Sequence, residues 1–348
     1  MSILDVLDTD DFEQLTLVRD PESGIRSAVA VHDTTMGPSL GGVRMRAYPT
    51  HDDAVRDALA LARAMTVKSA LAGLDLGGGK SVIDAEPTAS NKARFLPVHA
   101  RHIASLGGRY VPGADMGTDA SDMEVLAKHV PVVSSRRAPS PFTARGVFRA
   151  VGATLEWAGE RDLAGRRVAV QGLGKVGRAL VTLLRRAGAS VVVADVDDAR
   201  VREARDTAGA VPVGADEILT ADVDVLCPCA AGGVLTADVL AGLRARAVVS
   251  GANNPLATPG QAALLRERGV VYVPDFVANA GGVIACEAEV HGSDDGVDTK
   301  IEAIGVTAVE ILDAAAARGT DTLTVAEEIA RERLAARAAA RPAFPAVP

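Results

Sequence analysis

The sequence predicts an α/β fold with two domains, the second of which is built on a parallel sheet covered by helices on both faces. The chain has 348 residues, whereas single hydrophobic cores stop growing at about 250–300 residues. The first part of the chain mixes short strands with helices, and short apolar runs then alternate regularly with helical patterns. Such alternation is typical of parallel sheets. Two domains of different construction are therefore expected.

The composition excludes several classes of protein. Hydrophobic residues make up 48% and charged residues 24% of the chain, the usual globular mix, which excludes disorder along the whole chain. The net charge is −8 and no basic tract is present, so we expect no nucleic-acid partner. No stretch approaches the run of about 18 apolar residues that a membrane helix needs, so we expect no membrane partner either.

The cysteines and the first residues indicate the compartment. Cys227, Cys229 and Cys286 are too few to form a disulfide framework. The spacing of Cys227 and Cys229 is too short for a pair of zinc ligands, and we expect no metal site. The chain begins with an acidic stretch that lacks the basic-then-apolar order of a signal peptide. These observations predict a cytoplasmic protein.

The first domain is predicted to cover residues 1–138. Its apolar periodicity indicates two strands and two helices, in the ranges Ser27–His32, Ser81–Ile83, Asp52–Leu71 and Arg94–Leu106. A run of glycines directly before Lys80 is interpreted as a turn. Residues Pro131–Pro141 break all periodicity, and the stretch Ser134–Pro141 within them is rich in proline and serine, so we interpret this segment as a hinge between the domains.

The second domain is predicted to cover residues 139–320. It opens with a helix at Thr143–Trp157 and carries another at Val176–Ala187. Further apolar runs are interpreted as strands, namely Arg167–Gln171, Ser190–Asp195, Val223–Leu226, Ala247–Ser250 and Val270–Val273. Residues 321–348 are predicted to form a C-terminal helix that returns toward the first domain, with a loose tail from Ala338 onward.

A glycine-rich turn lies between the first of these strands and its helix. Gly172, Gly174 and Gly177 have the spacing G-x-G-x-x-G in the strand-turn-helix context that a dinucleotide-binding turn requires. The first glycine permits the tight turn, the second lets the backbone approach a pyrophosphate, and the third lets helix and strand pack closely. Asp195 ends the next strand, where a carboxylate accepts from a ribose 2′-hydroxyl and repels a 2′-phosphate. The second domain is therefore predicted to be of the Rossmann type and to bind NAD in preference to NADP.

Two lysines and one aspartate lie beside glycines in the first domain. Lys68 ends the predicted helix, Lys80 follows the glycine run, and Asp115 is flanked by glycines. A lysine that loses its hydration and has a second ammonium nearby has a lowered pKa and acts as a general base. Each residue alone also fits a plain alternative, a hydrated surface lysine or an aspartate that caps a turn. Taken singly, the residues leave both interpretations open.

Eight separated motifs occur in one order between about residue 12 and residue 335. They are Gly37-Pro-Ser-Leu-Gly-Gly42, Lys68, Leu76-Gly-Gly-Gly-Lys80, Asp115, Gly172-Leu-Gly-Lys-Val-Gly177, Cys227-Pro-Cys-Ala-Ala-Gly-Gly233, Gly251-Ala-Asn-Asn254 and Pro274-Asp-Phe-Val-Ala-Asn-Ala-Gly-Gly282. This order resembles the leucine/phenylalanine/valine branch of the amino-acid dehydrogenases, which are relatives of glutamate dehydrogenase. The resemblance covers nearly the whole chain.

The resemblance implies an enzyme that oxidatively deaminates a neutral apolar L-amino acid to its 2-oxo acid and ammonia, with NAD taking the hydride. It implies that Lys68 binds the substrate carboxylate, that Lys80 is the general base that activates water, and that Asp115 carries protons to and from the amino nitrogen. It also implies that the first domain binds substrate and mediates oligomerisation, so that the protein is a homo-oligomer. A reaction that needs one cation and two proton-transfer groups agrees with these roles.

The resemblance also assigns the rest of the site. Its implied substrate-binding residues are Lys68, Gly41, Leu40, Met65, Gly113, Asn254, Val283 and Cys286. Its implied cofactor-binding residues are Gly172, Gly174, Lys175, Val176, Gly177, Asp195, Thr143, Ala230, Asn253 and Asn254. The sequence departs from the family's usual pattern at Ser134–Ala138, which is shorter and more basic, and at Cys286, where valine or leucine is commoner.

The substrate pocket implied by the resemblance is apolar. None of its side chains offers a charge for the γ-carboxylate of glutamate, and burying that carboxylate without a partner would cost several kcal/mol. Leu40 resembles the branched-chain enzymes, whereas Gly113 resembles the phenylalanine enzymes, so the preferred apolar amino acid stays open. Two alternatives are a dehydrogenase of a polar or biosynthetic amino acid, and an NAD-binding regulatory protein without catalysis. The second alternative requires the loss of Lys68, Lys80 or Asp115, and all three are present.

Overall fold

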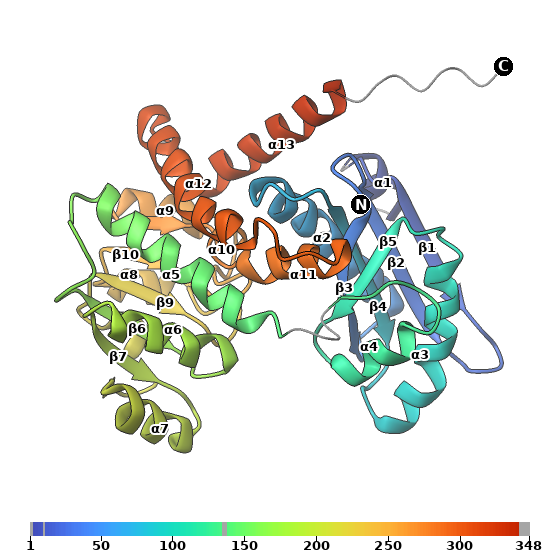
Figure 1. Ribbon diagram of the computed structural model, residues 1–348, viewed down its shortest axis with the longest axis horizontal. Helices are drawn as coiled ribbons and strands as arrows, with labels where there is room; N and C mark the ends of the chain where they lie inside the picture. The colour runs from blue at the N-terminus through green and yellow to red at the C-terminus, as the bar shows by residue number, and fades with distance from the viewer. Residues whose placement is uncertain (1–2, 10, 134–137, 341–348) are drawn as a thin grey trace. The chain divides into compact units, whose positions relative to one another are not determined.

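The computed structural model describes residues 3–9, 11–133 and 138–340, and the chain divides into two compact units. The first unit holds Met1–Ala138, Cys286–Asp294 and Ala330–Pro348, and the second holds Pro139–Ala285 and Asp295–Ile329. Each unit has a sheet of its own (Figure 1), and the predicted α/β class is confirmed. Part of the expected hinge, residues 134–137, lies outside the described residues.

The first unit is a mixed sheet with helices on both faces (Figure 1, blue to teal). Its five strands lie in the order β1-β2-β4-β3-β5. In chain order, β1 to β5 are Gln14–Arg19, Arg26–Asp33, Ser39–Arg46, Gly77–Asp84 and Tyr110–Ala114, and α1 to α4 are Ile3–Thr9, His51–Leu71, Ala89–Ala104 and Ala120–Leu126. Strands β3, β4 and β5 run parallel, while β2 is antiparallel to β4 and β1 is antiparallel to β2.

Four of these elements confirm the sequence prediction, and others are absent from it. The strands predicted from Ser27 and from Ser81 correspond to β2 and β4, and the helices predicted from Asp52 and from Arg94 correspond to α2 and α3. The sequence pattern does not indicate β1, β3, β5, α1 or α4. Of these, β3 matters most, because it carries two of the motif glycines, Gly41 and Gly42.

The strands divide their side chains between the two faces of this sheet. Ala30 and Val82 lie in a buried cluster with residues of α2, whereas Val31 and Ile83 lie in a second cluster with residues of α3 and α4. Successive strand residues point to opposite faces. Lys80, two residues before Val82, therefore lies on the face toward α2.

The glycines before Lys80 belong to β4 and do not form the turn that the sequence predicts. A Cβ on Gly77 would lie 2.0 Å from the carbonyl oxygen of Asp33, and a Cβ on Gly78 would lie 2.1 Å from the backbone nitrogen of Thr66 in α2. Glycine disfavours strands when only local sequence is considered. Here the close approach of α2 and a neighbouring strand requires it, so tertiary packing overrides the local preference.

The second unit is a parallel sheet of six strands in the order β11-β10-β9-β6-β7-β8. In chain order, β6 to β11 are Arg167–Gln171, Ser190–Ala194, Val211–Pro212, Val225–Pro228, Ala247–Val249 and Val271–Val273. Every strand predicted for this part is confirmed, and β8 is additional. Counted from β6, the spatial order is 3-2-1-4-5-6, the order of doubly wound dinucleotide-binding sheets.

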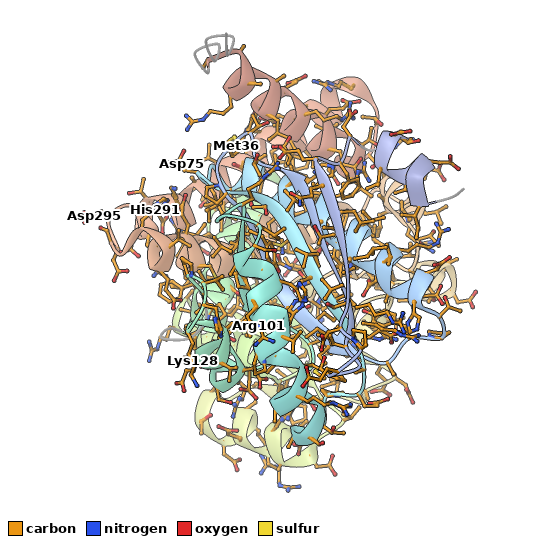
Figure 2. All side chains as sticks on the ribbon, turned by 90° about the vertical axis from the view of Figure 1, so that its right-hand side faces the viewer. Met36, Asp75, Arg101, Lys128, His291 and Asp295 are labelled. Carbon is orange, nitrogen blue, oxygen red and sulfur yellow. The ribbon has the colours of Figure 1, made fainter. Side chains whose placement is uncertain are left out.

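The helices of the remaining chain are α5 to α13. Their bounds are Ser140–Trp157, Lys175–Arg186, Asp198–Ala208, Ala237–Gly242, Gln261–Glu267, Asp275–Ala278, Gly281–His291, Val297–Arg318 and Thr322–Ala340. The last of these extends through Ala338–Ala340, which the sequence predicts as tail, and residues 341–348 lie outside the described part. In the first unit, the Asp75 backbone N–H donates to Glu287 Oε1 of α11 at 2.7 Å; Figure 2 labels Asp75 and His291, the last residue of α11.

Candidate active site

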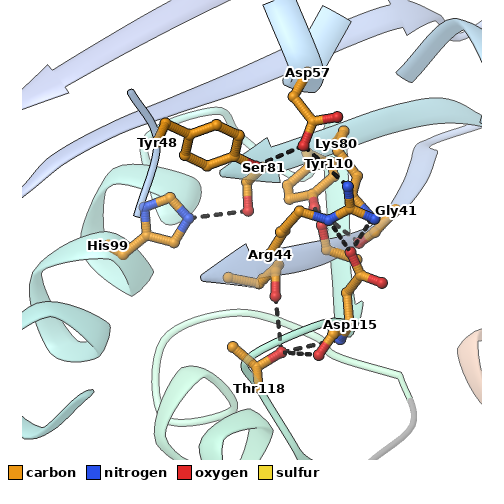
Figure 3. A network of polar contacts seen from close by, with 12 residues as sticks. Gly41, Arg44, Tyr48, Asp57, Lys80, Ser81, His99, Tyr110, Asp115 and Thr118 are labelled. Carbon is orange, nitrogen blue, oxygen red and sulfur yellow. Dashed lines mark hydrogen bonds and ion pairs between the residues drawn. The ribbon is translucent and has the colours of Figure 1, made fainter. Parts of the chain in front are cut away.

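Lys80, which is buried, and Asp115, which is partly buried, form an ion pair on the face of the first sheet toward α2 (Figure 3). Lys80 lies in β4, and Asp115 directly follows β5. The Lys80 Nζ atom donates to Asp115 Oδ2 at 2.6 Å, and 7% of the lysine side chain is exposed. The Asp115 backbone N–H donates to Thr118 Oγ1 at 2.9 Å, and that hydroxyl donates to the Val43 carbonyl at 2.7 Å. The hydrogen bond of the Asp115 backbone and the ion pair with Lys80 therefore both fix the position of the carboxylate.

Two glycines of β3, the strand between β4 and β5, make room for this pair. A Cβ on Gly42 would lie 2.6 Å from Asp115 Cβ and 3.0 Å from Lys80 Nζ. A Cβ on Gly41 would lie 1.7 Å from the Gly79 carbonyl oxygen, so the pairing of β3 with β4 depends on that glycine. The sequence assigned Gly41 to the substrate site but did not identify Gly42, whose signal is its place next to Gly41 in the same motif.

Burial and nearby charges set the ionisation of the pair. Loss of hydration lowers the pKa of Lys80 even though the Asp115 carboxylate opposes that shift. Burial alone would raise the pKa of Asp115, but the Lys80 and Arg44 cations outweigh it and lower the pKa to about 2. A lysine with a lowered pKa next to an ionised aspartate has the properties of a general base with a proton carrier.

Three residues that the sequence analysis did not identify extend the hydrogen bonding from Asp115. Arg44 Nε donates to Asp115 Oδ2 at 3.0 Å, and Arg44 Nη1 donates to Asp57 Oδ2 at 2.9 Å. The Tyr48 hydroxyl donates to the same Asp57 oxygen at 2.5 Å. The only local signal for Arg44 is its position two residues after Gly42 on one strand, which places both on the same face.

The other substrate residues inferred from the resemblance lie in both units. Leu40 and Gly113 are buried in β3 and β5, and Met65 and Lys68 are half-buried in α2. Cys286 is a buried residue of the first unit, whereas Val283 and Asn254 belong to the second unit. In the first unit, Leu40 lies on the α2 face together with Gly42, because the two residues are two positions apart on one strand.

The glycine-rich turn of the second unit has the geometry of a phosphate-binding turn. Gly172 has φ +92°, a conformation that favours glycine. A Cβ on Gly177 would lie 1.9 Å from the Gly172 carbonyl oxygen, whereas a Cβ on Gly174 would meet no atom within 4 Å. Gly174 precedes α6, so open space lies at the N-terminus of a helix, where backbone N–H groups and the helix dipole favour an anion. Lys175 and Val176 are the first residues of that helix.

A cavity of about 310 Å³ lies where the strand order reverses, between the ends of β6 and β9. Its wall includes Gly172, Gly174, Asp195, Arg200 and Ala230, and also Cys229, which the sequence analysis did not assign to the site. The ends of the strands at such a reversal are where doubly wound sheets bind nucleotides. Gly172, Gly174, Asp195 and Ala230, which the sequence analysis assigns to cofactor binding, therefore line one cavity.

Asp195 has backbone partners in addition to its place on the cavity wall. Its Oδ2 accepts from the Leu173 N–H at 2.5 Å, and its Oδ1 accepts from the Asp197 N–H at 2.9 Å. Arg200 Nη1 lies 3.8 Å from Asp195 Oδ2. The carboxylate thus joins the glycine-rich turn to the end of β7, with a guanidinium beside it.

Asn253 and Asn254 lie in a loop after β10 that is held by residues the sequence analysis did not assign. Asn254 has φ +50°, and its N–H donates to Asp275 Oδ2 at 3.0 Å. Asn279 Nδ2 donates to Asn253 Oδ1 at 2.9 Å. A buried aspartate and a buried asparagine therefore fix the conformation of this loop. Thr143, the remaining predicted cofactor residue, is half-buried in the first turn of α5.

Metal sites, disulfides and membrane helices each place requirements on the described residues. Within them, no group of three or more His, Cys, Asp or Glu side chains is arranged to hold a metal ion. The three cysteines are free thiols, and burial raises the pKa of Cys229 to about 12. Among the described helices, none has the length and apolar character required to cross a membrane.

Comparison with protein families decides which enzymes this geometry belongs to. Residues 13–131 match the dimerisation domain of the Glu/Leu/Phe/Val dehydrogenases, and residues 137–203 and 196–341 match the Glutamate/Leucine/Phenylalanine/Valine dehydrogenase domain. The chain belongs to the Glu/Leu/Phe/Val dehydrogenase family. It is an amino-acid dehydrogenase, as the order of its motifs predicts, and members of this family use a nicotinamide dinucleotide.

Relatives within the family match over nearly the full length. Leucine dehydrogenase of Bacillus subtilis is 36% identical over 96% of this chain and 94% of that enzyme. Valine dehydrogenase of Streptomyces virginiae is 40% identical over 92% of this chain and 93% of that enzyme. The structure of L-tryptophan dehydrogenase from Nostoc punctiforme superimposes with a TM-score of 0.87 and 32% identity, covering 97% of this chain and 99% of that one.

A more distant member has a known assembly. The hetero-hexameric glutamate dehydrogenase of Thermus thermophilus, solved with leucine bound, superimposes with a TM-score of 0.78. The two sequences are 26% identical, and the match covers 96% of this chain and 91% of the other. The family therefore includes enzymes named for leucine, valine, tryptophan and glutamate.

Proposed function

We propose that the protein catalyses the reversible, NAD-dependent oxidative deamination of neutral apolar L-amino acids to 2-oxo acids and ammonia. The observation that carries the proposal is the Lys80–Asp115 ion pair, with 2.6 Å between Nζ and Oδ2, in space cleared by glycines. Family membership narrows the chemistry to amino-acid oxidation. The pair supplies the two proton-transfer groups that such a reaction needs.

Each of the three polar site residues of the first unit has one role in this proposal. Lys68 binds the substrate carboxylate, which stays charged throughout the reaction. Lys80, with its lowered pKa, accepts a proton from the water that attacks the imino carbon of the oxidised substrate. Asp115 exchanges protons with the amino nitrogen, so that the carbon–nitrogen bond breaks with ammonia as the leaving group. Burial of the Lys80 side chain, of which 7% is exposed, limits its contact with bulk water.

The residues of the second unit fit a nicotinamide dinucleotide. The open space at Gly174 and the helix N-terminus suit the pyrophosphate, and the Asp195 carboxylate suits a ribose diol. When bound, the dinucleotide accepts the hydride from the α-carbon of the amino acid. The proposed contacts of the nicotinamide end are Thr143, Asn253 and Asn254. The two asparagines lie in the loop that Asp275 and Asn279 fix.

The proposed substrate class follows from the side chains around the pair. Leu40, Met65 and Gly113 are apolar or lack a side chain, and none of them pairs with a side-chain carboxylate. Leucine and valine dehydrogenases are among the relatives, which favours branched-chain substrates. A methylene group in such a pocket changes specificity by only about 1–3 kcal/mol, so we expect overlapping activities.

A panel of the twenty L-amino acids with NAD, followed by absorbance at 340 nm, tests the proposal. We expect activity with leucine, valine, isoleucine or phenylalanine, and amination of the corresponding 2-oxo acids by ammonia. The matched control is the same panel of D-amino acids, which we expect to be inactive. Activity confined to glutamate, to polar amino acids or to D-amino acids would contradict the proposal.

We predict that Asp195 sets the choice of coenzyme. Asp195→Asn removes one negative charge and keeps a side-chain oxygen for the Leu173 N–H, while Arg200 stays beside the site. Because the variant no longer repels a 2′-phosphate, we expect the ratio of kcat/KM for NADP to that for NAD to rise about tenfold or more. A factor of ten corresponds to a free-energy change of about 1.4 kcal/mol.

The control for this variant is Asp198→Asn, which removes an exposed charge from the first turn of the neighbouring helix α7. We expect it to leave the ratio unchanged. A wild-type enzyme that already prefers NADP would show that Asp195 does not act in this way.

We also propose that the enzyme is a cytoplasmic homo-oligomer. Residues 13–131 match a domain named for dimerisation, and the related glutamate dehydrogenase is a hexamer. Within the described sheet, the edge strand β1 pairs with β2 alone, and it exposes 62% of Leu17. Unpaired edges of this kind accept a further strand. Free thiols suit a reducing compartment.

A further inference from the structure

The Lys80–Asp115 pair is one end of a larger network of polar side chains (Figure 3). Arg44 bridges two carboxylates, with Nε on Asp115 at 3.0 Å and Nη1 on Asp57 at 2.9 Å. The Tyr48 hydroxyl donates to Asp57 at 2.5 Å. The side chains of Arg44, Asp57 and Asp115 are only 17%, 27% and 25% exposed. A planar guanidinium held at two points in this way has one orientation.

This network connects three elements that are separate in sequence. Arg44 lies in β3, Asp57 in α2, and Asp115 after β5. Lys80 and Arg44 share one acceptor, since both donate to Asp115 Oδ2. Asp115 is thus held by two cations, of which only the lysine can lose its proton near neutral pH, because arginine stays charged.

This difference matters for the proposed reaction. When Lys80 gives up its proton to act as a base, Asp115 loses one of its two positive neighbours. Arg44 keeps its charge, because burial alone would lower its pKa but Asp115 and Asp57 outweigh burial and raise it. Arg44 also disfavours the ammonium form of Lys80, whereas the Asp57 carboxylate favours it. The arginine and the aspartate therefore act on the base with opposite signs.

The other titratable groups near the pair come from the surrounding elements. On the opposite face of the sheet, Tyr110 of β5 lies in the buried cluster with residues of α3 and α4; its hydroxyl donates to the Gly41 carbonyl at 2.8 Å, and burial raises its pKa. Helix α2 carries Lys68 in addition to Asp57, and the segment between β3 and α2 carries Tyr48. On the α3 face, His99 lies between Ser27 and Ser81, and burial lowers its pKa to about 3, so it is neutral.

We propose that Arg44 is a positioning residue of this enzyme: it fixes the Asp115 carboxylate and supplies the permanent positive charge that lets Lys80 lose its proton while Asp115 stays ionised. Asp57, supported by Tyr48, holds Arg44 in place and limits the size of that effect. The inference rests on the proposed function, because it gives Arg44 a part in the proton transfers assigned to Lys80 and Asp115.

Two substitutions test the charge of Arg44 by their opposite signs. In Arg44→Met, the low-pH limb of the kcat/KM profile, where Lys80 deprotonates, should move to higher pH. In Asp57→Asn, which keeps the shape of the side chain, the same limb should move to lower pH. The substrate ionises identically with every variant, so a difference between profiles belongs to the protein. A purely structural role would lower activity in both variants without moving the limb in opposite directions.

A third substitution separates charge from orientation. Arg44→Lys keeps a cation but cannot bridge two carboxylates with a planar fork. We expect it to leave the limb near its wild-type position and to lower kcat by about tenfold or more, because Asp115 is no longer fixed. Tyr48→Phe removes the hydroxyl that supports Asp57 and should lower kcat less. Arg101→Met, an exposed arginine on α3 of the same unit, is the control and should behave as wild type.

A measurement without turnover keeps this inference separate from the proposed function. Competitive labelling with acetic anhydride, with the Lys80 peptide quantified by mass spectrometry across pH, reports the fraction of free amine in each variant. If the wild type oxidises no amino acid, the proposed function is wrong, and the labelling still tests Arg44. If Arg44→Met and Asp57→Asn label Lys80 with the wild-type pH dependence, Arg44 does not have this role. If Arg44→Met does not fold, Arg44→Lys and Asp57→Asn carry the comparison.

Discussion

Replacing Lys80 by methionine should lower kcat by about 10²–10⁴-fold, the usual effect of losing a general base. Methionine has a similar length and no charge, so it fills the buried position without leaving a cavity. Without the amine, nothing accepts the proton of the attacking water at the position of Nζ. We also expect the low-pH limb of the kcat/KM profile to disappear, since that limb reports the deprotonation of Lys80.

Lys68 is the comparison that separates binding from proton transfer. Lys68→Ala should raise KM strongly and lower kcat less, because the carboxylate it binds keeps its charge throughout the reaction. Steady-state kinetics of both variants, with thermal unfolding to confirm that each is folded, give this contrast. If Lys80→Met keeps more than about a tenth of wild-type kcat with the same pH profile, the base lies elsewhere.

The sequence predicts the second unit well because its elements are local. Each apolar run of β6, β7, β9, β10 and β11 is a buried parallel strand, and such strands are recognisable without knowing their partners. The glycine-rich turn is likewise contiguous, since Gly172, Gly174 and Gly177 need only a strand before them and a helix after them. The cavity at Asp195 follows from the strand order.

The first unit is harder to predict because glycines stand where strands are needed. Gly41 and Gly42 weaken the pattern of β3, and the glycines before Lys80 imitate a turn. Each of them is nevertheless required, because a Cβ at its position would lie only 1.7–2.7 Å from a neighbouring atom. These neighbours belong to α2 and to other strands, which are distant in sequence. Local preference therefore predicts loops in a region where tertiary packing forms strands.

The same separation in sequence hides the charged residues around the proposed catalytic pair, Lys80 and Asp115. Arg44 meets Asp57 thirteen residues later and Asp115 seventy-one residues later. Each of these side chains alone is compatible with an ordinary hydrated surface. Only the pairing of β3 with both β4 and β5, under the cover of α2, shows that they share one site. Recognition of the motifs identified Lys80 and Asp115 but did not identify their neighbours.

Gly42→Ala should separate catalysis from folding. The added methyl group would lie 2.6 Å from Asp115 Cβ and 3.0 Å from Lys80 Nζ. The Asp115 Cβ atom is fixed to its backbone and cannot rotate away, so the carboxylate must move. A displacement of about 1 Å in a catalytic group costs up to about 10²-fold in rate, and overpacking costs about 1–3 kcal/mol of stability. We therefore expect a folded protein with kcat reduced by about 10²-fold.

Two further alanine substitutions serve as controls, one with a smaller and one with a larger expected effect than Gly42→Ala. In Gly152→Ala, within α5, the new methyl group meets no atom within 4 Å, so activity should stay at the wild-type level. In Gly41→Ala, the methyl group would lie 1.7 Å from the Gly79 carbonyl oxygen, so the pairing of β3 with β4 should fail and the protein should lose its fold. Urea unfolding and kcat measured on all three variants test the order. Full activity in Gly42→Ala would show that catalysis does not depend on the close approach of Lys80 and Asp115 that this glycine permits.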